Sequence, residues 1–121
     1  MDLKNYAKKE KIKYFMVTYT DLFGVQRAKL VPASAISDMQ KDGAGFAGFA
    51  SWLDMTPAHP DMLAVPDPQS VIKLPWKKDV AWLASNCMME GKMVEQAPRN
   101  VLNKAIDRAK KKSMRVKTGI E

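Results

Sequence analysis

A glycine-rich stretch in the first half of the chain places the strongest limit on its fold. Between residues 41 and 51, three glycines are interspersed with Asp42, Phe46 and Phe49. Glycine destabilises the interior of a helix or strand, so we expect a loop here. Two phenylalanine rings on a loop need cover, because exposed apolar surface costs roughly 25 cal/mol per Å². The loop is therefore either a turn anchored by its aromatics or the wall of a site that includes Asp42.

The composition is that of an ordinary globular domain. Of 121 residues, 46% are hydrophobic and 27% are charged, which suits one domain with a modest core. No apolar run approaches the ~20 residues of a membrane span, so we expect no membrane association. Cys87 is the single cysteine; it excludes an internal disulfide, indicates a cytoplasmic protein and is expected to fill a small buried space. The lone histidine, His59, gives no basis for a metal site.

Charge is distributed unevenly along the chain. The net charge is +7, and residues 99–121 hold eight Lys and Arg against two acids, whereas residues 33–76 hold two Lys against five Asp. No aromatic residue lies among the C-terminal bases, as stacking on single-stranded nucleic acid would require. We therefore interpret the basic segment as a solvated helix face and expect no nucleic-acid partner. The acidic middle segment is expected to attract cations.

Hydrophobic periodicity and turn residues predict a mixture of helices and strands. A hairpin over residues 12–31 is indicated by two β-rich runs on either side of Asp21-Leu22-Phe23-Gly24. Four prolines keep residues 51–69 irregular, apart from a short strand at 62–65. The other predicted elements are helices at 2–11, from a Ser34 cap to Gly43 and from Pro98 past Ala109, and strands at 70–75, 79–89 and 114–121.

The last predicted strand, over residues 114–121, has no partner after it in the sequence. A strand in that position leaves an open edge, which natural proteins avoid. We therefore expect a fragment, with one complete small domain followed by the first helix and strand of a second.

Seven short motifs follow one another along nearly the whole chain. They are Thr20-Asp21-Leu22-Phe23-Gly24, Lys29-Leu30-Val31-Pro32, Asp42-Gly43-Ala44-Gly45-Phe46-Ala47-Gly48-Phe49, Asp61-Met62-Leu63-Ala64-Val65-Pro66-Asp67, Leu74-Pro75-Trp76, Ala97-Pro98-Arg99 and Gly119-Ile120-Glu121. In this order they resemble the N-terminal part of a glutamine synthetase. The glycine-rich loop also resembles the branch of that family that contains γ-glutamylmethylamide and related γ-glutamyl-amine ligases.

This resemblance implies an α+β fold in two parts. Residues 1–96 would form a β-grasp domain, which is a mixed sheet holding a packed helix. Residues 97–121 would form the first helix and strand of a truncated α/β catalytic domain. The rest of that domain would carry the nucleotide, the glutamate and most of the metal ligands.

The resemblance also implies a reaction. ATP would phosphorylate the γ-carboxylate of glutamate, and ammonia or a small amine would displace the phosphate to give glutamine or a γ-glutamyl amide. Two divalent cations, Mg or Mn, would neutralise the charge on the phosphoryl group. Identical subunits would form a ring-shaped homo-oligomer, in which the β-grasp domain of one subunit closes the catalytic site of its neighbour.

Three site residues follow from matching the family's motifs. Asp42 corresponds to a loop aspartate that reaches the neighbouring subunit's site, binds ammonium and accepts its proton; the alternative is an acid that merely ends a helix before glycine. Asp61 corresponds to a second acid that faces the same intersubunit site, and its alternative is a turn cap. Glu121 corresponds to the first glutamate of a metal-binding strand, so we expect it to be a metal ligand.

The sequence departs from the commonest glutamine synthetases in ways that leave the amine open. The loop lacks their serine, and extra residues separate Asp42 from Asp61. Ammonia, methylamine and larger amines all remain candidates. Because one metal ligand cannot hold a catalytic cation, we expect this chain alone to bind no cofactor and to be inactive.

A second class of function is a stand-alone β-grasp interaction module. The ligase hypothesis predicts that Phe46, Phe49 and Trp52 lie in or near a subunit interface and that Asp42 points away from the core. The module hypothesis predicts instead a basic patch over residues 108–117 with salt-sensitive binding.

Overall fold

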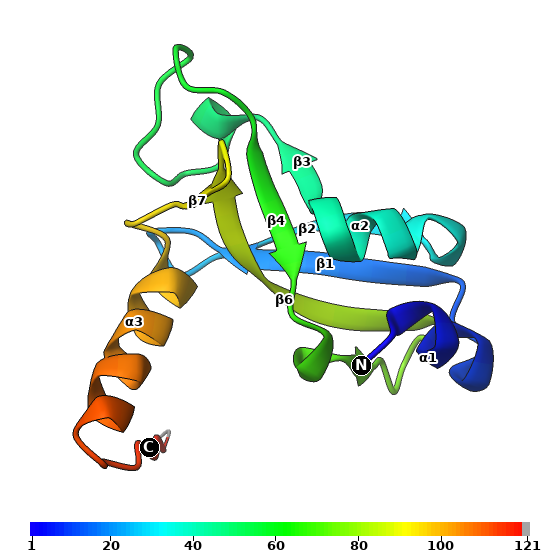
Figure 1. Ribbon diagram of the computed structural model, residues 1–121. Helices are drawn as coiled ribbons and strands as arrows, with labels where there is room; N and C mark the ends of the chain where they lie inside the picture. The colour runs from blue at the N-terminus through cyan, green and yellow to red at the C-terminus, as the bar shows by residue number, and fades with distance from the viewer. Residues whose placement is uncertain (120–121) are drawn as a thin grey trace.

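The computed structural model describes residues 1–119 and shows an α+β fold (Figure 1). The helices are α1 (Leu3–Glu10), α2 (Ile36–Asp42) and α3 (Pro98–Lys111), with short 3-10 helices at Ala33–Ala35, Gly48–Ala50 and Pro68–Ser70. The strands are β1 (Tyr14–Thr20), β2 (Gln26–Pro32), β3 (Ala44–Phe46), β4 (Met62–Pro66), β5 (Ile72–Lys73), β6 (Val80–Met89) and β7 (Lys92–Met93). None of the described helices is long and apolar enough to cross a membrane.

The strands form one mixed sheet in the order β2-β1-β6-β4-β3, with β5 and β7 also paired to β6. β1 and β2 form the predicted antiparallel hairpin, whereas β1 and β6 run parallel. β6 occupies the centre because it is long and almost wholly apolar. This arrangement confirms the expected mixed sheet of a β-grasp domain.

The core lies between the sheet and the helices α1 and α2. Leu3 of α1, Ile36 of α2 and Phe15 of β1 are fully buried there. Asp2 fixes the start of α1, because its side chain accepts hydrogen bonds from the backbone N–H groups of Lys4 and Asn5. α1 and α2 therefore cover one face of the sheet, and no helix among residues 1–119 covers the opposite face in the same way.

The glycine-rich stretch is more regular than predicted, because it contains β3 and a 3-10 helix. Gly43 has φ +88° and ends α2, and a Cβ there would lie 3.2 Å from the Ala64 carbonyl oxygen. That close approach lets Ala44 pair directly with Ala64 of β4. Ladder hydrogen bonds thus outweigh the low strand propensity of glycine.

Three other predictions about local structure are wrong. Ser34 caps no helix, because the cap positions are Pro32 and Ala35 and neither makes a side-chain cap. The strand expected at 70–75 shrinks to Ile72–Lys73, between a 3-10 helix and Pro75. Residues 114–119 form no strand, since no neighbouring strand satisfies their backbone groups in the described part of the chain.

α3 begins with Pro98 at its first turn, as predicted, and projects away from the sheet (Figure 1). Its first turn is attached to β6 through buried Asn100, whose Nδ2 donates to the carbonyl oxygens of Cys87 (2.7 Å) and Val94 (2.8 Å). The division of the chain at residues 96 and 97 remains a prediction.

Candidate functional site

Asp42 is the last residue of α2 and its side chain is exposed, as predicted. A carboxylate at the C-terminal end of a helix opposes the helix dipole, so it does not stabilise α2. No hydrogen bond or ion pair joins it to another residue in the range 1–119. The turn after the helix is made by Gly43, which has the positive φ. Asp42 is therefore free to interact with a ligand or another chain.

Asp61 is also exposed and lies immediately before β4. The β3–β4 register pairs Ala44 with Ala64 and Phe46 with Met62, so Asp42 and Asp61 flank opposite ends of this ladder. At about 3.4 Å per residue, their separation is on the order of 15 Å. A single chain therefore does not bring the two predicted catalytic acids together.

The described residues do not form a metal site. No three His, Cys, Asp or Glu side chains among residues 1–119 lie close enough to share an ion. Glu121, the predicted metal ligand, lies outside the described residues. This part of the chain thus does not fit a metal by itself.

Residues 51–53, at the end of the glycine-rich stretch, are held in place by hydrogen bonds to their three consecutive backbone carbonyls. The three donors come from β1, from the hairpin turn and from the segment before α3. They are the Tyr19 hydroxyl to Ser51 O (3.1 Å), the Leu22 N–H to Trp52 O (3.2 Å) and the Gln96 amide to Leu53 O (2.8 Å). The segment is therefore fixed although it lies in irregular, proline-rich chain.

This segment displays Trp52 on the surface. Trp52 has φ +56°, which is unusual for a bulky residue, and 54% of it is exposed. Its ring lies edge-on to Phe23 at 5.7 Å, and the Arg27 guanidinium lies 5.7 Å from its centroid. Backbone strain of this kind persists only where the surroundings impose it, and it is concentrated at functional positions.

The two phenylalanines of the glycine-rich loop differ in their surroundings. Phe46 is partly buried against the core and packs edge-on to Tyr19 at 5.0 Å, so it anchors the loop. Phe49 is 60% exposed. Phe49, like Trp52, is thus an aromatic residue that its own chain leaves largely exposed.

Asp21 has a structural role beyond the turn position that the sequence predicts for it. It is fully buried at the hairpin turn. One carboxylate oxygen accepts from the N–H groups of Phe23 and Val25 at 2.9 Å, and the other accepts from Arg27 Nε at 2.8 Å. Arg27 Nη2 also lies 2.8 Å away. Asp21 thereby fixes both the turn and the arginine beside Trp52, and an arginine six residues after a turn aspartate is the only signal of this in the sequence.

The basic residues of α3 are mostly solvated, as predicted. Lys104 pairs with Glu95 at 3.1 Å and Lys110 with Asp107 at 3.9 Å, all at exposed positions. Arg99 differs, because it bonds Asp67 at 2.6 Å and Asn86 at 3.1 Å. Arg99 therefore fastens the start of α3 to the sheet.

Comparison with known proteins identifies the family, although no protein-family model matches the chain. The glutamine synthetase of Rhizobium leguminosarum bv. phaseoli is 67% identical over 121 residues, and that of Rhizobium meliloti (strain 1021) is 63% identical over 121 residues. A glutamate–methylamine ligase from Methyloversatilis universalis is 33% identical over 122 residues. This chain belongs to the glutamine synthetase family. It spans 28% of the length of each of these relatives.

A solved structure agrees with this assignment of the chain to the glutamine synthetase family. The structure described as a GmaS/ADP complex in conformation 1 matches with a TM-score of 0.89 and 55% identity. The match covers 92% of this chain and 26% of the other. The fold is thus the N-terminal β-grasp domain of glutamine synthetases and GmaS.

The buried carboxylate of Asp21 makes the stability of this glutamine-synthetase domain depend on acid. Burial alone raises the pKa of a carboxyl, but hydrogen bonds from the Val25 N–H, Arg27 and the Phe23 N–H outweigh it and hold the pKa of Asp21 below its usual value. A depressed pKa contributes stability above the unfolded value of about 4, and that contribution is lost as the pH falls through the folded value. As the pH falls below about 4, we expect the free energy of unfolding to decrease less in Asp21→Asn than in wild type.

Urea unfolding at a series of pH values measures this difference. Asp54→Asn serves as the control, because Asp54 is an exposed acid in irregular chain. The role given to Asp21 would be contradicted if the unfolding free energies of wild type, Asp21→Asn and Asp54→Asn all fell equally as the pH is lowered.

Cys87 is buried in β6, and burial raises the pKa of its thiol to about 12. Only a thiolate reacts rapidly with disulfide reagents. We expect no labelling by Ellman's reagent in the folded protein at about pH 8, and full labelling after unfolding in urea. Rapid labelling of the folded chain would show that Cys87 is not the inert core residue that the sequence predicts.

Proposed function

We propose that this chain is the N-terminal part of an ATP-dependent ligase of the glutamine synthetase type. The complete enzyme would join ammonia or a small amine to the γ-carboxylate of glutamate through γ-glutamyl phosphate, in the cytoplasm. The observation that carries this proposal is the 67% identity to a glutamine synthetase over all 121 residues.

In this proposal Asp42 binds the ammonium or amine and accepts its proton. An exposed carboxylate with no partner in its own chain can stabilise a cation by charge and hydrogen bonding, and it can then act as a base. Asp61 faces the same intersubunit site, but it lies on the order of 15 Å from Asp42 within one chain. We therefore give Asp61 a part in binding and not in the same proton transfer.

The exposed aromatics support the subunit contact of the proposed ring. Phe49 and Trp52 are 60% and 54% exposed, and Phe23 at the hairpin tip is 73% exposed. Aromatic side chains beside an arginine are typical anchors of protein interfaces. We propose that this cluster, with Arg27, contacts the neighbouring subunit next to the site that Asp42 enters.

ATP and two Mg or Mn ions complete the proposed reaction. When bound, ATP supplies the phosphoryl group and the cations stabilise its charge. Their ligands would come from the remainder of the full-length chain and from Glu121, because the described residues hold no metal cluster. The 121-residue chain alone is accordingly expected to be inactive.

Two amines have specific support. Ammonia is favoured by the glutamine synthetases at 67% and 63% identity, which exceed the 33% of the glutamate–methylamine ligase. Methylamine is the second candidate, because the loop resembles that branch and the GmaS structure is 55% identical.

The test is an assay of the full-length enzyme. Phosphate release from ATP is measured with glutamate and with ammonia, methylamine or ethylamine in turn. We expect glutamate-dependent release that one of these amines stimulates, which would also identify the substrate. Folded, full-length protein that releases no phosphate with any amine would contradict the proposal and favour the interaction module.

A further inference from the structure

The face of the sheet opposite α1 and α2 carries an apolar row, which we call the outer face. Met16 of β1 pairs with Leu30 of β2 and with Trp82 of β6, and Trp82 pairs with Ile72 of β5. Paired residues on neighbouring strands project to the same side of a sheet, so these four form one row. Leu30 is 57% exposed, Ile72 is 55% exposed and Trp76, just beyond β5, is 79% exposed.

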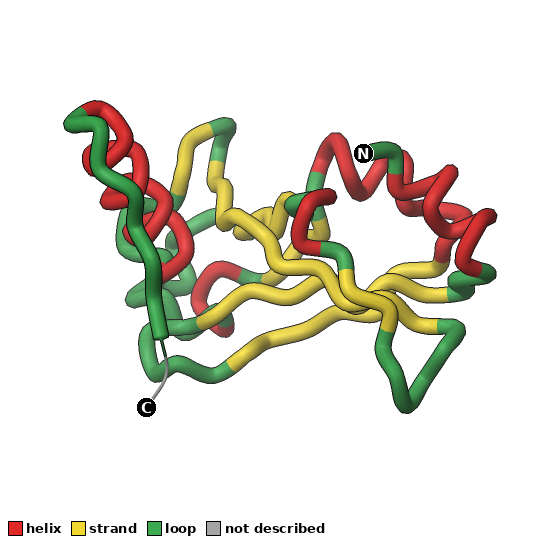
Figure 2. Tube along the Cα trace, turned by 90° about the horizontal axis from the view of Figure 1, so that it is seen from below, coloured by secondary structure: helices red, strands yellow, loops and turns green. Residues whose placement is uncertain are grey.

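The sequence of β6 indicates that this face is covered in the complete protein. A strand with one face in water alternates apolar and polar residues, whereas a strand covered on both faces is apolar throughout. β6 runs Val-Ala-Trp-Leu-Ala-Ser-Asn-Cys-Met-Met, with Ser85 and Asn86 as its only polar residues. Figure 2 shows α1 and α2 on one side of the strands. The side chains of β6 that project to the other side, such as Trp82, are therefore not covered by these two helices.

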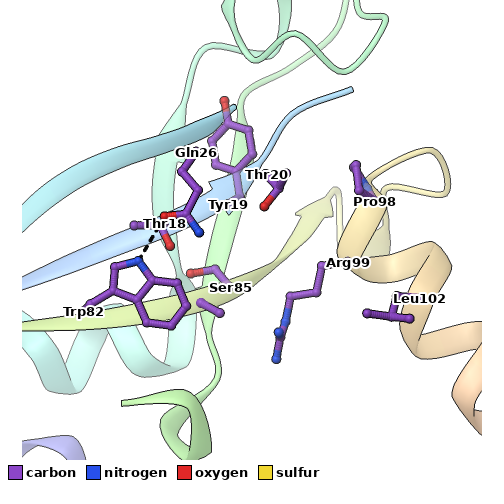
Figure 3. Close-up of a pocket in the computed structure, with 10 residues that line it drawn as sticks. Thr18, Tyr19, Thr20, Gln26, Trp82, Ser85, Pro98, Arg99 and Leu102 are labelled. Atoms are coloured by element: carbon purple, nitrogen blue, oxygen red, sulfur yellow. Dashed lines mark hydrogen bonds between the residues drawn. The ribbon is translucent and has the colours of Figure 1, made fainter. Parts of the chain in front are cut away.

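α3 lies at the end of the outer face. Figure 3 shows the pocket between them, where Gln26 and Trp82 from the sheet lie across from Arg99 and Leu102 of α3. Arg99 is fixed there by its ion pair with Asp67, just after β4, and by its hydrogen bond to Asn86 of β6. Leu102 remains 50% exposed. The first turns of α3 therefore lie beside the outer face, and Leu102 extends its apolar surface onto the helix.

We propose that the part of the full-length chain beyond residue 121 packs on the outer face and makes an intrachain contact. This inference rests on the proposed function, since it assumes a longer chain like those of relatives of which this sequence spans 28%. A segment tethered through α3 has a high effective concentration at this surface. Its contacting side would be apolar, to match Leu30, Ile72 and Trp76.

The neighbouring subunit is the less suitable occupant. The exposed cluster proposed for the subunit contact is centred on Phe23 and Trp52, at the hairpin turn that follows β1. Ile72 pairs with Trp82, which pairs with Met16 near the start of β1, whereas Phe23 lies beyond the end of β1. The outer face is thus a separate surface, and the two surfaces predict different crosslinks.

Photo-crosslinking in the full-length protein tests this. p-Benzoylphenylalanine is placed at position 76, and in a control protein at position 23, which is Phe23 and 73% exposed. We expect position 76 to give a product of monomer mass whose crosslinked peptide comes from beyond residue 121. Position 23 is expected to give covalent dimers.

Other outcomes at position 76 would overturn the proposal. Covalent dimers would assign the outer face to a neighbouring subunit, and the absence of any crosslink would show a free surface. Position 72 on β5 provides a second site if the first variant does not assemble like wild type. The readout does not depend on activity, so failure of the ligase assay and failure of this contact are distinguishable.

Discussion

Replacing Asp42 with asparagine in the full-length enzyme will lower amine-dependent turnover by about 10²–10⁴-fold, the usual contribution of a general base. Asparagine keeps the shape of the side chain but loses its charge and its capacity to take a proton. The protein will remain folded, because the Asp42 side chain is exposed and its carboxylate makes no hydrogen bond or ion pair within residues 1–119. Steady-state kinetics with the preferred amine measure the effect.

Asp38→Asn is the matched control, because Asp38 is an exposed acid in the first turn of the same helix. It should leave turnover unchanged. Slow, glutamate-dependent ATP cleavage without amine should also survive in Asp42→Asn, since phosphorylation precedes the step assigned to Asp42. Full amine-dependent activity in Asp42→Asn would rule out its catalytic role.

Leu53→Ala will destabilise the domain by about 2–5 kcal/mol, as large-to-small changes in a core do. Leu53 is fully buried although it lies in the proline-rich segment. Its backbone carbonyl also accepts the hydrogen bond from Gln96, so a cavity there loosens the segment that carries Trp52. Urea unfolding of the 121-residue chain gives the change in unfolding free energy.

Leu22→Ala provides the comparison, because Leu22 is the same residue type and 47% exposed at the hairpin turn. It should change stability by no more than about 0.5 kcal/mol. Similar losses in both variants would mean that the proline-rich segment is not anchored by a buried Leu53.

The elements with strong local signals could be predicted from the sequence. The hairpin follows from two β-rich runs around Asp21–Gly24, and α3 follows from Pro98 and its helical periodicity. β3 could not be predicted, because its existence depends on pairing with β4 across an irregular segment. The burial of Asp21 likewise depends on the folded position of Arg27.

The candidate site divides in the same way. Exposure of Asp42 was predictable from its place before a glycine at the end of a helix. Its distance from Asp61 was not, because it depends on the register of Ala44 with Ala64. The three hydrogen bonds that hold residues 51–53 could not be predicted either, because their donors come from distant parts of the chain.

Mixed oligomers test whether the active site of the full-length enzyme is shared between subunits, as we propose. Full-length Asp42→Asn and Glu121→Gln chains are co-expressed with different tags, and oligomers that contain both are purified. If Asp42 of one subunit completes the site that holds Glu121 of the next, about a quarter of the sites in a random mixture are intact and activity returns to that level. If both residues act within one chain, every site lacks one of them, and the mixture will be as inactive as either parent.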